Sequence, residues 1–475
     1  MPMKKILCLS LFLVMVLGLC ACGKSGKAET VPKPDQLMVG YGRVDITPEY
    51  PVSLAGSASD RLSTDILDPL YMTCIAIKKA EQTYLVVTID LVGTYEAYAN
   101  AVRSAMATAT GIPEDQIILN ATHTHSSVSA SSGEKEGIAQ YQMQLVEWGA
   151  AAATEAVDDL SPAEVWYGST MAEGMAWVRH YTLNNGTYAG ANFGDFNSGA
   201  ITGHAQDADT EMQLIRFERP AKDKKDVVLM NFPAHATMNG SGTEISADFP
   251  GPARKYVAET TNTLVAYFIA AAGNQVPSSR IASENFSSDY NIYGEELGHI
   301  AVNALNNMTK LDSSEVKFSQ KTFVGQSNKE DMHLLPEALV VESIWAQVGG
   351  RGTEAGRKAA KEHGFSSVYE VTAILNRAKF AETRSIELKA LAIGDVSMIF
   401  APYEMFGSNG RQIKDASPYG MTFIVTCSHG HAGYLPDKLG VDIRCYEAQI
   451  TKFTPGTAEI LVQEYVNMLT ELKGQ

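Results

Sequence analysis

Strands and helices alternate regularly along this sequence from residue 38 onward, and that alternation limits the architectures open to it. Residues 71–93 form two apolar runs joined by a polar turn, which predicts a pair of strands. Residues 95–111 are alanine-rich with helical spacing and close at a glycine, and residues 136–160 predict a longer helix. No linker-like stretch interrupts the pattern. We therefore expect residues 38–475 to form one large α/β domain, in which a large mixed sheet is flanked by helices.

Two dipeptides predict tight turns, and one segment stays open. Asn185-Gly186 and Gly394-Asp395 each lie between apolar runs, which is typical of β-hairpins. Residues 331–383 are polar and mostly helical, with a glycine-rich break. The sequence leaves open whether this segment is a mobile lid or a scaffold insertion.

The first 22 residues have the composition of an export signal. Two lysines precede an apolar stretch, and the sequence LCAC, which ends at Cys22, is similar to a bacterial lipobox. The apolar stretch is short for a membrane span. We therefore expect residues 1–21 to be a lipoprotein signal peptide and residues 22–37 to be a tether. The protein would then lie outside the cytoplasm, anchored to a bacterial membrane through lipid on Cys22.

Cysteine content and charge exclude several classes of protein. Outside the export segment only Cys74, Cys427 and Cys445 remain, too few and too scattered for a disulfide framework or a CxxC metal site. Cys427 and Cys445 could still form a bridge. The formal net charge of the chain is −16, and two of its 38 basic residues lie in the export signal. So acidic a body argues against nucleic acid as a partner.

Two histidines one residue apart, His123 and His125, end an apolar run in the sequence ILNATHTHSS. Imidazole is the most common protein ligand for zinc, and residues i and i+2 of a strand face the same side. Both rings could therefore line one pocket. By itself, the stretch fits a polar strand end equally well.

Other candidate ligands also lie at strand ends. His235 ends the run NFPAH, and Glu404 follows an apolar strand, where a charge is unusual unless it is paired or bound to metal. His429 and His431 form a second His-x-His pair, in a glycine-rich loop, and compete as a half-site. Three histidines and a glutamate at strand ends would suit zinc with an open position for water. Their spacing alone does not establish that they meet.

Six blocks of the sequence occur in the order found in the neutral/alkaline ceramidase family. They are VGYGRVDITP, ILNATHTHSS, FPAHATMNGSGTEISADFPGPAR, YFIAAAGN, LAIGDVSMIFAPYEMFG and GYLPDKLGVDIRCYEA. From about residue 38 to residue 470 the chain resembles that family. The resemblance implies a zinc-dependent amidohydrolase that cleaves an N-acyl amide bond by a metal-activated water. It also implies a second, immunoglobulin-like domain, which we expect this chain to lack because the sequence stops soon after the last block.

The resemblance implies a role for each matching residue. It implies that the ligands of the zinc ion are His123, His235, Glu404 and Tyr434. His125 would line the site and hydrogen-bond or transfer a proton, while Arg179 and Tyr446 would hold the scissile carbonyl and stabilise the oxyanion. Asp248 could fix one of the ligands from behind or cap the helix that follows it.

The chain departs from the family pattern at one position. Where family members have an active-site serine in a GDVSPN-like block, this chain reads GNQVPSSR and has Val276, with Asn274 in the place of an aspartate. Ser278 and Ser279 lie nearby but out of register. A serine nucleophile is therefore a poor interpretation, whereas a metal-activated water does not need that serine.

Three functions remain open on the sequence. The first is zinc-dependent cleavage of a lipid amide, with sphingolipid metabolism as its setting. The second is a zinc hydrolase that acts on a non-lipid amide or ester, which the missing serine and the missing second domain favour. The third is a non-catalytic, ligand-binding surface lipoprotein. A wide apolar channel would favour a lipid substrate, and a small polar pocket would argue against one.

Overall fold

The computed structural model describes residues 35–56, 61–131, 134–190, 199–281 and 285–475. Residues 35–475 form one compact unit. The predicted signal peptide and Cys22 lie outside the described residues. Within the described ranges, no helix is both long enough and apolar enough to cross a membrane.

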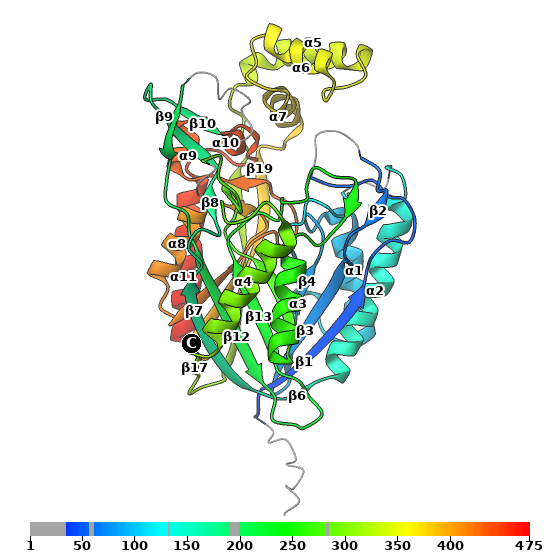
Figure 1. The fold of residues 1–475 in the computed structure, drawn as a ribbon, viewed down its shortest axis with the longest axis vertical. Coiled ribbons are helices and arrows are strands. Elements are labelled where there is room, and N and C mark those ends of the chain that lie inside the picture. The colour runs from blue at the N-terminus through cyan, green and yellow to red at the C-terminus, as the bar shows by residue number, and fades with distance from the viewer. Residues whose placement is uncertain (1–34, 57–60, 132–133, 191–198, 282–284) are drawn as a thin grey trace, which may run out of the picture. The chain divides into compact units, whose positions relative to one another are not determined.

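Three large sheets make up the body, which Figure 1 shows as a ribbon. Each of them has a parallel pair of strands at one edge. The first sheet has the order β5 (Ile117–Ala121), β4 (Gln82–Ile89), β3 (Tyr71–Lys79), β1 (Met38–Asp45) and β6 (Ser161–Pro162). The second has the order β15 (Leu264–Ile269), β13 (Val227–Phe232), β12 (Glu211–Glu218), β7 (Glu164–Met171) and β17 (Thr309–Lys310). The third has the order β18 (Val316–Gln326), β19 (Thr383–Ile393), β20 (Val396–Phe400) and β22 (Met421–Val425).

A helix crosses over between the two parallel strands of each sheet. The three crossover helices, which follow β4, β13 and β20, are α1 (Glu96–Thr110), α3 (Pro250–Thr261) and α8 (Gly407–Ala416). The carboxyl ends of parallel strands linked in this way are where α/β folds commonly bind ligands. His123 comes after the end of β5, His235 after β13 and Glu404 after β20, so each sheet brings one candidate ligand to this end.

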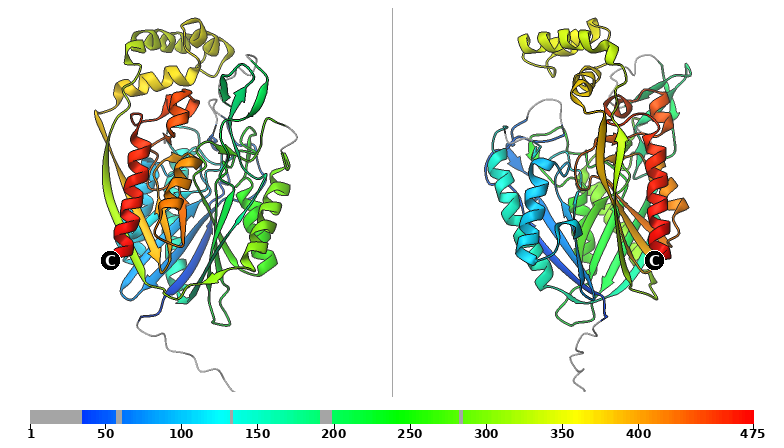
Figure 2. Two further views of the ribbon diagram at one scale, coloured as in Figure 1. Left: turned by 90° about the vertical axis from the view of Figure 1, so that its left-hand side faces the viewer. Right: turned by 180° about the vertical axis from the view of Figure 1, so that it is seen from behind.

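The inner faces of the three sheets share one apolar core, and the outer faces are covered by helices. In β13, Val227 and Leu229 point into the shared core, whereas Val228 and Met230 pack outward on helices, as the two-residue period of a strand requires. The helices that complete the three outer layers are α2 (Ile138–Asp158), α4 (Tyr290–Leu305) and α11 (Thr457–Gly474). Figure 2 shows α11, in red, alongside strands of the third sheet.

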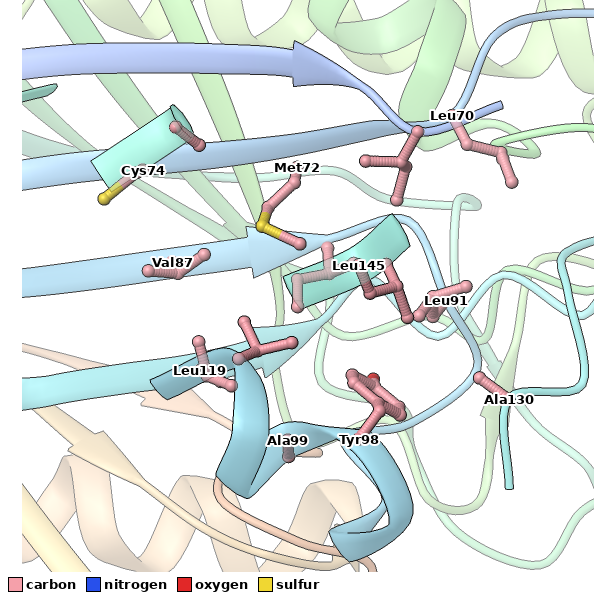
Figure 3. Close-up of a cluster of buried hydrophobic side chains, with 14 of the residues drawn as sticks. Leu70, Met72, Cys74, Val87, Leu91, Tyr98, Ala99, Leu119, Ala130 and Leu145 are labelled. Atoms are coloured by element: carbon pink, nitrogen blue, oxygen red, sulfur yellow. The ribbon is translucent and has the colours of Figure 1, made fainter. Parts of the chain in front are cut away.

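The outer layer of the first sheet illustrates this packing (Figure 3). Met72 and Cys74 of β3 lie with Val87 of β4 against Tyr98 of α1 and Leu145 of α2, and all five side chains are fully buried. Close apolar packing of this kind fixes the positions of the strands, and with them the positions of the polar residues at the strand ends.

Short strand pairs and helices surround the carboxyl ends of the sheets. The short strands are β8 (Trp177–Val178) with β16 (Gln275–Val276), β9 (His180–Leu183) with β10 (Tyr188–Gly190) and β11 (Ile201–His204), β2 (Asp65–Ile66) with β14 (Glu244–Ile245), and β21 (Glu404–Met405) with β23 (Tyr434–Leu435). The remaining helices are α5 (Leu335–Gln347), α6 (Glu354–Glu362), α7 (Val368–Lys379), α9 (Lys438–Asp442) and α10 (Tyr446–Ile450). Helices α5, α6 and α7 share a small apolar core of their own, and α7 packs against α10 (Figure 1).

Most sequence-based expectations for the fold are confirmed. The α/β class with mixed sheets and flanking helices is observed, although three sheets take the place of one. Asn185-Gly186 and Gly394-Asp395 join β9 to β10 and β19 to β20 as predicted. Cys427 and Cys445 are buried free thiols and form no bridge with each other.

Candidate metal centre

The predicted ligands His123, His235 and Glu404 meet at the carboxyl ends of the sheets. Nε2 of His123 lies 3.2 Å from Oε2 of Glu404, and Nε2 of His235 lies 3.1 Å from the same oxygen. His125 completes the group, because its Nε2 lies 3.2 Å from Nε2 of His123. The ring centroid of His123 is 4.6 Å from that of His235 and 4.8 Å from that of His125. Three imidazoles and one carboxylate therefore face a common point.

Each imidazole is oriented by a main-chain carbonyl on its far side. Nδ1 of His123 lies 2.5 Å from the carbonyl oxygen of Val92. Nδ1 of His235 lies 2.6 Å from that of Ala272, and Nδ1 of His125 lies 3.3 Å from that of Gly56. Donation from Nδ1 to a carbonyl places a ring proton there and makes Nε2 the nitrogen that faces the site. This arrangement is typical of histidines that bind metal through Nε2.

The backbone around His123 is held tightly. Its φ of 66° is in the left-handed region, which non-glycine residues seldom adopt unless the surroundings enforce it. The preceding Thr122 donates its hydroxyl to Asp90, and Asp90 forms two hydrogen bonds of 2.7 and 2.8 Å with Arg254 of α3. All four residues are buried. This buried ion pair ties the end of the first sheet to a helix of the second, and it fixes where the His123 ring points.

The charges at this point suit a divalent cation. Burial lowers the pKa of His235 to about 4, and burial together with the neighbouring His123 lowers the pKa of His125, so both rings are neutral. Burial raises the pKa of Glu404, but His123 outweighs it and holds that pKa well below its usual range. The Nε2 atoms of His123 and His235 lie 3.2 and 3.1 Å from one Glu404 oxygen, and imidazole and carboxylate together form a donor set that fits zinc.

Tyr434, the fourth predicted ligand, lies next to Glu404. The two residues are register partners in the parallel pair of β21 and β23. The Tyr434 hydroxyl accepts a hydrogen bond of 3.4 Å from Nη2 of Arg179, and its ring lies 5.8 Å from that of Tyr446. Both tyrosines line the cavity described below, so the structure brings them to the site.

A cavity of about 450 Å³ opens over these groups. His123, His125 and Glu404 lie at its base. Helix α7 contributes one wall, and Tyr369 of that helix packs edge-on against Tyr446 with their ring centroids 4.9 Å apart. The segment 331–383, whose role the sequence left open, therefore takes part in the site through α7.

Arg179 lies behind the cavity rather than in it. It is not among the residues that line the cavity, and it reaches the site through its contact with Tyr434. Nε of Arg179 donates to Oε1 of Glu447 at 2.6 Å, and Nε2 of His180 lies 2.9 Å from Oε2 of the same carboxylate. Sequence reasoning missed Glu447 and His180. Their positions in the sequence could have indicated them, because His180 directly follows Arg179 and Glu447 directly follows Tyr446.

His180, Cys445 and Glu447 also lie close enough together to hold a metal ion. Arg179 and His180 already engage both oxygens of the Glu447 carboxylate. We therefore interpret this group as an ion-pair network.

The competing pair His429 and His431 does not assemble into such a group among the described residues. The ring of His429, which is half-buried, lies 6.2 Å from that of Phe400, while His431 lines the cavity beside Tyr95, with ring centroids 4.9 Å apart. Val276, at the family's serine position, pairs with Trp177 and is not among the residues that line the cavity.

Asp248 supports a loop. Its carboxylate accepts hydrogen bonds of 2.8 Å from the backbone N–H groups of Asn239 and Phe249. The N-cap position of α3 is occupied by Phe249, so Asp248 precedes the cap. These hydrogen bonds hold the connection that leads from His235 to α3.

Comparison with known proteins identifies the family and the fold. The family model for neutral/alkaline non-lysosomal ceramidase, N-terminal, matches residues 37–280, which is more than half of the chain. The chain therefore belongs to the neutral/alkaline non-lysosomal ceramidase family, and its fold and family are those of a ceramidase-like hydrolase.

Two solved structures share the fold. The neutral ceramidase from Pseudomonas aeruginosa is 17% identical, with a TM-score of 0.67 over 93% of this chain and 75% of that chain. A ceramidase complexed with C2 is 16% identical, with a TM-score of 0.68 over 93% of this chain and 76% of that chain. The comparison with curated proteins finds no match.

Proposed function

We propose that this chain is a zinc-dependent amidohydrolase that cleaves the N-acyl bond of an amide substrate. The observation that carries the proposal is the convergence of the His123 and His235 Nε2 atoms on Glu404, beside a cavity that His123 and Glu404 line. Family membership supports a hydrolase, and the relative complexed with C2 supports a ligand site in this fold. The nitrogen and carboxylate donors support zinc over a harder cation.

The residues that would hold the zinc ion are His123, His235, Glu404 and Tyr434. Zinc bound by such a set lowers the pKa of a water molecule towards neutrality and polarises a substrate carbonyl. The backbone carbonyls on the far side of each ring keep Nε2 directed at the site.

His125 is placed to move a proton. It is partly exposed, lines the cavity, and is held by the Gly56 carbonyl through Nδ1, which leaves Nε2 facing the reacting groups. Burial lowers the pKa of His125, so the ring is neutral and Nε2 can accept a proton from the attacking water. The same atom can then deliver that proton to the departing amine.

Tyr446 and Arg179 have different roles. Tyr446 lines the cavity, and burial raises its pKa, so its hydroxyl keeps the proton and can donate to the substrate carbonyl oxygen as charge develops there. Arg179 acts one step further back, as a positioning residue that holds the Tyr434 hydroxyl.

An activity assay tests the proposal. Full-length protein would be incubated with a panel of N-acyl amides, including a short-chain ceramide, and amine release would be followed before chelation, after chelation and after zinc is restored. We expect activity that is lost with the metal, regained with zinc, and absent in His235→Ala. The exposed His299, which lies on α4, provides the matched control His299→Ala. Activity that survives full chelation would overturn the zinc mechanism.

We also propose that the protein acts outside the cytoplasm, held at a bacterial membrane by lipid on Cys22. The support is the sequence of residues 1–22 alone. Mass spectrometry of the mature N-terminus would show a lipidated cysteine, and Cys22→Ser would release the protein from the membrane fraction. An unmodified N-terminus that begins at Met1 would contradict this proposal.

A further inference from the structure

The cavity over the candidate metal centre is rich in positive charge, although the chain as a whole is acidic. Its lining includes one carboxylate, Glu404, which faces the histidines. The cationic side chains that line it are Lys135, Arg351, Arg377 and Lys452. In a chain of formal net charge −16, such a concentration of cations around one small space is unexpected from composition.

Lys452 forms no salt bridge among the described residues, although the carboxylates of Glu96 and Glu404 act on its charge from a greater distance. Its ammonium group donates to the backbone carbonyl of His431, and its aliphatic stem packs over Gly433, the residue directly before Tyr434. The side chain is only partly exposed. A half-buried ammonium with no carboxylate in direct contact gains from a ligand that contacts it, because burial removes part of its hydration.

Arg351 is the second cation without an acidic partner in the part of the chain that the structure describes. It lies in the turn between α5 and α6, and its Nη1 donates to the Thr372 hydroxyl of α7 at 3.1 Å. The rest of its guanidinium fork is available to a ligand in the cavity. Arg377, by contrast, is engaged by the backbone carbonyls of Glu330 and Gln449 at 3.0 and 2.6 Å.

A neutral amide and an anionic amide would meet this cavity very differently. A neutral substrate such as ceramide would displace water from Lys452 and Arg351 and leave both charges without a partner. An anionic group would form charge-assisted hydrogen bonds with both, and a carboxylate or sulfonate matches the fork geometry of arginine. Cations that line a concave space also concentrate anions there before binding.

We infer that the cavity selects N-acyl amides that carry a carboxylate or a sulfonate, and that Lys452 and Arg351 bind this anionic group. The inference rests on the proposed function for the amide bond, whereas the binding of the anion depends on the two cations alone. Lys452, beside Gly433, and Arg351, against Thr372 of α7, both line the cavity that would receive this anionic group.

Calorimetric binding to the full-length protein tests this inference without relying on turnover. The ligands are octanoylglycine, octanoyltaurine and the neutral octanoylglycinamide, which share one acyl chain and one amide bond. We expect each anionic ligand to bind at least about ten-fold more tightly than the neutral one. Lys452→Met and Arg351→Met would each remove most of that difference, and Lys452→Arg would retain it. The control Lys438→Met removes an exposed lysine outside the cavity and would keep the full difference.

Amine release from the same compounds separates failure of this inference from failure of the proposed function. Cleavage of all three amides with equal kcat/KM, together with equal binding, would overturn the charge selectivity and leave the hydrolase intact. Absence of cleavage, with a charge preference in binding that disappears in Lys452→Met, would overturn the proposed function and support the anion site. A charge preference that persists in both methionine variants would overturn the assignment to these residues.

Discussion

The Glu447 carboxylate joins Arg179 to His180 in the layer behind the candidate metal centre. Oε1 accepts a hydrogen bond of 2.6 Å from Arg179, and Oε2 lies 2.9 Å from Nε2 of His180. Arg179 in turn lies 3.4 Å from the hydroxyl of Tyr434. All of these side chains are buried. An ion pair therefore supports one of the proposed ligands from behind.

We expect Glu447→Gln to weaken both the fold and the metal site. Removal of one charge leaves the buried Arg179 uncompensated, which costs about 3 kcal/mol of unfolding free energy for a pair of this kind. Loss of the support for Tyr434 would lower zinc affinity by about ten-fold. Urea unfolding and competition with a zinc chelator measure the two effects.

The exposed pair Glu164 and Lys310 provides the control for this variant. Exposed ion pairs contribute less than about 1 kcal/mol, so Glu164→Gln should leave both stability and zinc affinity close to those of the wild type. Equal losses in Glu447→Gln and Glu164→Gln would show that the buried network has no special role.

Gly56→Ala tests the proposed role of His125. A methyl group at Gly56 would lie 2.6 Å from the Cβ and Nδ1 atoms of His125, and the residue has a φ of +81°. Displacement of the His125 ring should lower kcat by about 10- to 100-fold while zinc remains bound. Gly174→Ala has the same kind of backbone strain, with a φ of +77° and no neighbour within 4 Å, and should retain kcat. Loss of zinc in Gly56→Ala would instead make His125 a ligand.

The stability of the protein should depend on pH through Asp248. Burial raises the pKa of this carboxyl to about 6, despite its hydrogen bonds to Asn239 and Phe249. An unfolded aspartate has a pKa of about 3.9, so the folded state binds the proton more tightly and gains stability as pH falls from about 6 towards about 4. Asp248→Asn should remove a gain on the order of 2 kcal/mol over that range.

The asparagine variant is a fair comparison because Asp248 has a φ of 56°, a conformation that asparagine tolerates. Urea unfolding of both proteins between pH 4 and pH 7 measures the difference. If the wild type and Asp248→Asn differ by the same amount at every pH, the proton is not bound more tightly in the folded state.

Val276→Ser tests the departure from the family pattern. Val276 pairs with Trp177 in a short two-stranded sheet and is not among the residues that line the cavity. We expect the serine to change kcat by no more than about two-fold and to form no acyl-enzyme detectable by mass spectrometry. A large rise in kcat or a covalent adduct at residue 276 would mean that the serine position takes part in the reaction.

The local structure could be predicted from the sequence because its causes are local. The two-residue alternation of β13, with Val227 and Leu229 on one face and Val228 and Met230 on the other, marks a strand covered on both sides. Asn185-Gly186 predicted its hairpin because that dipeptide adopts the required turn.

The arrangement of the site could not be predicted from local patterns. His235 and Glu404 lie 169 residues apart, and only the closing of the three sheets around a shared core brings them to hydrogen-bonding distance. Family resemblance assigns Arg179 to the scissile carbonyl, which stays a prediction, and the structure adds that its guanidinium contacts the Tyr434 hydroxyl. The direction in which a side chain points depends on its tertiary partners, here Glu447, which the sequence patterns did not identify.

The zinc content of the purified full-length protein tests the central claim most directly. Wild type, His235→Ala and His299→Ala would be equilibrated with zinc, separated from free metal by gel filtration and measured by plasma mass spectrometry. The account predicts about one zinc ion per chain in the wild type and in His299→Ala, and almost none in His235→Ala. Wild-type protein that is folded but retains no zinc, or retains as much as His235→Ala, would contradict it.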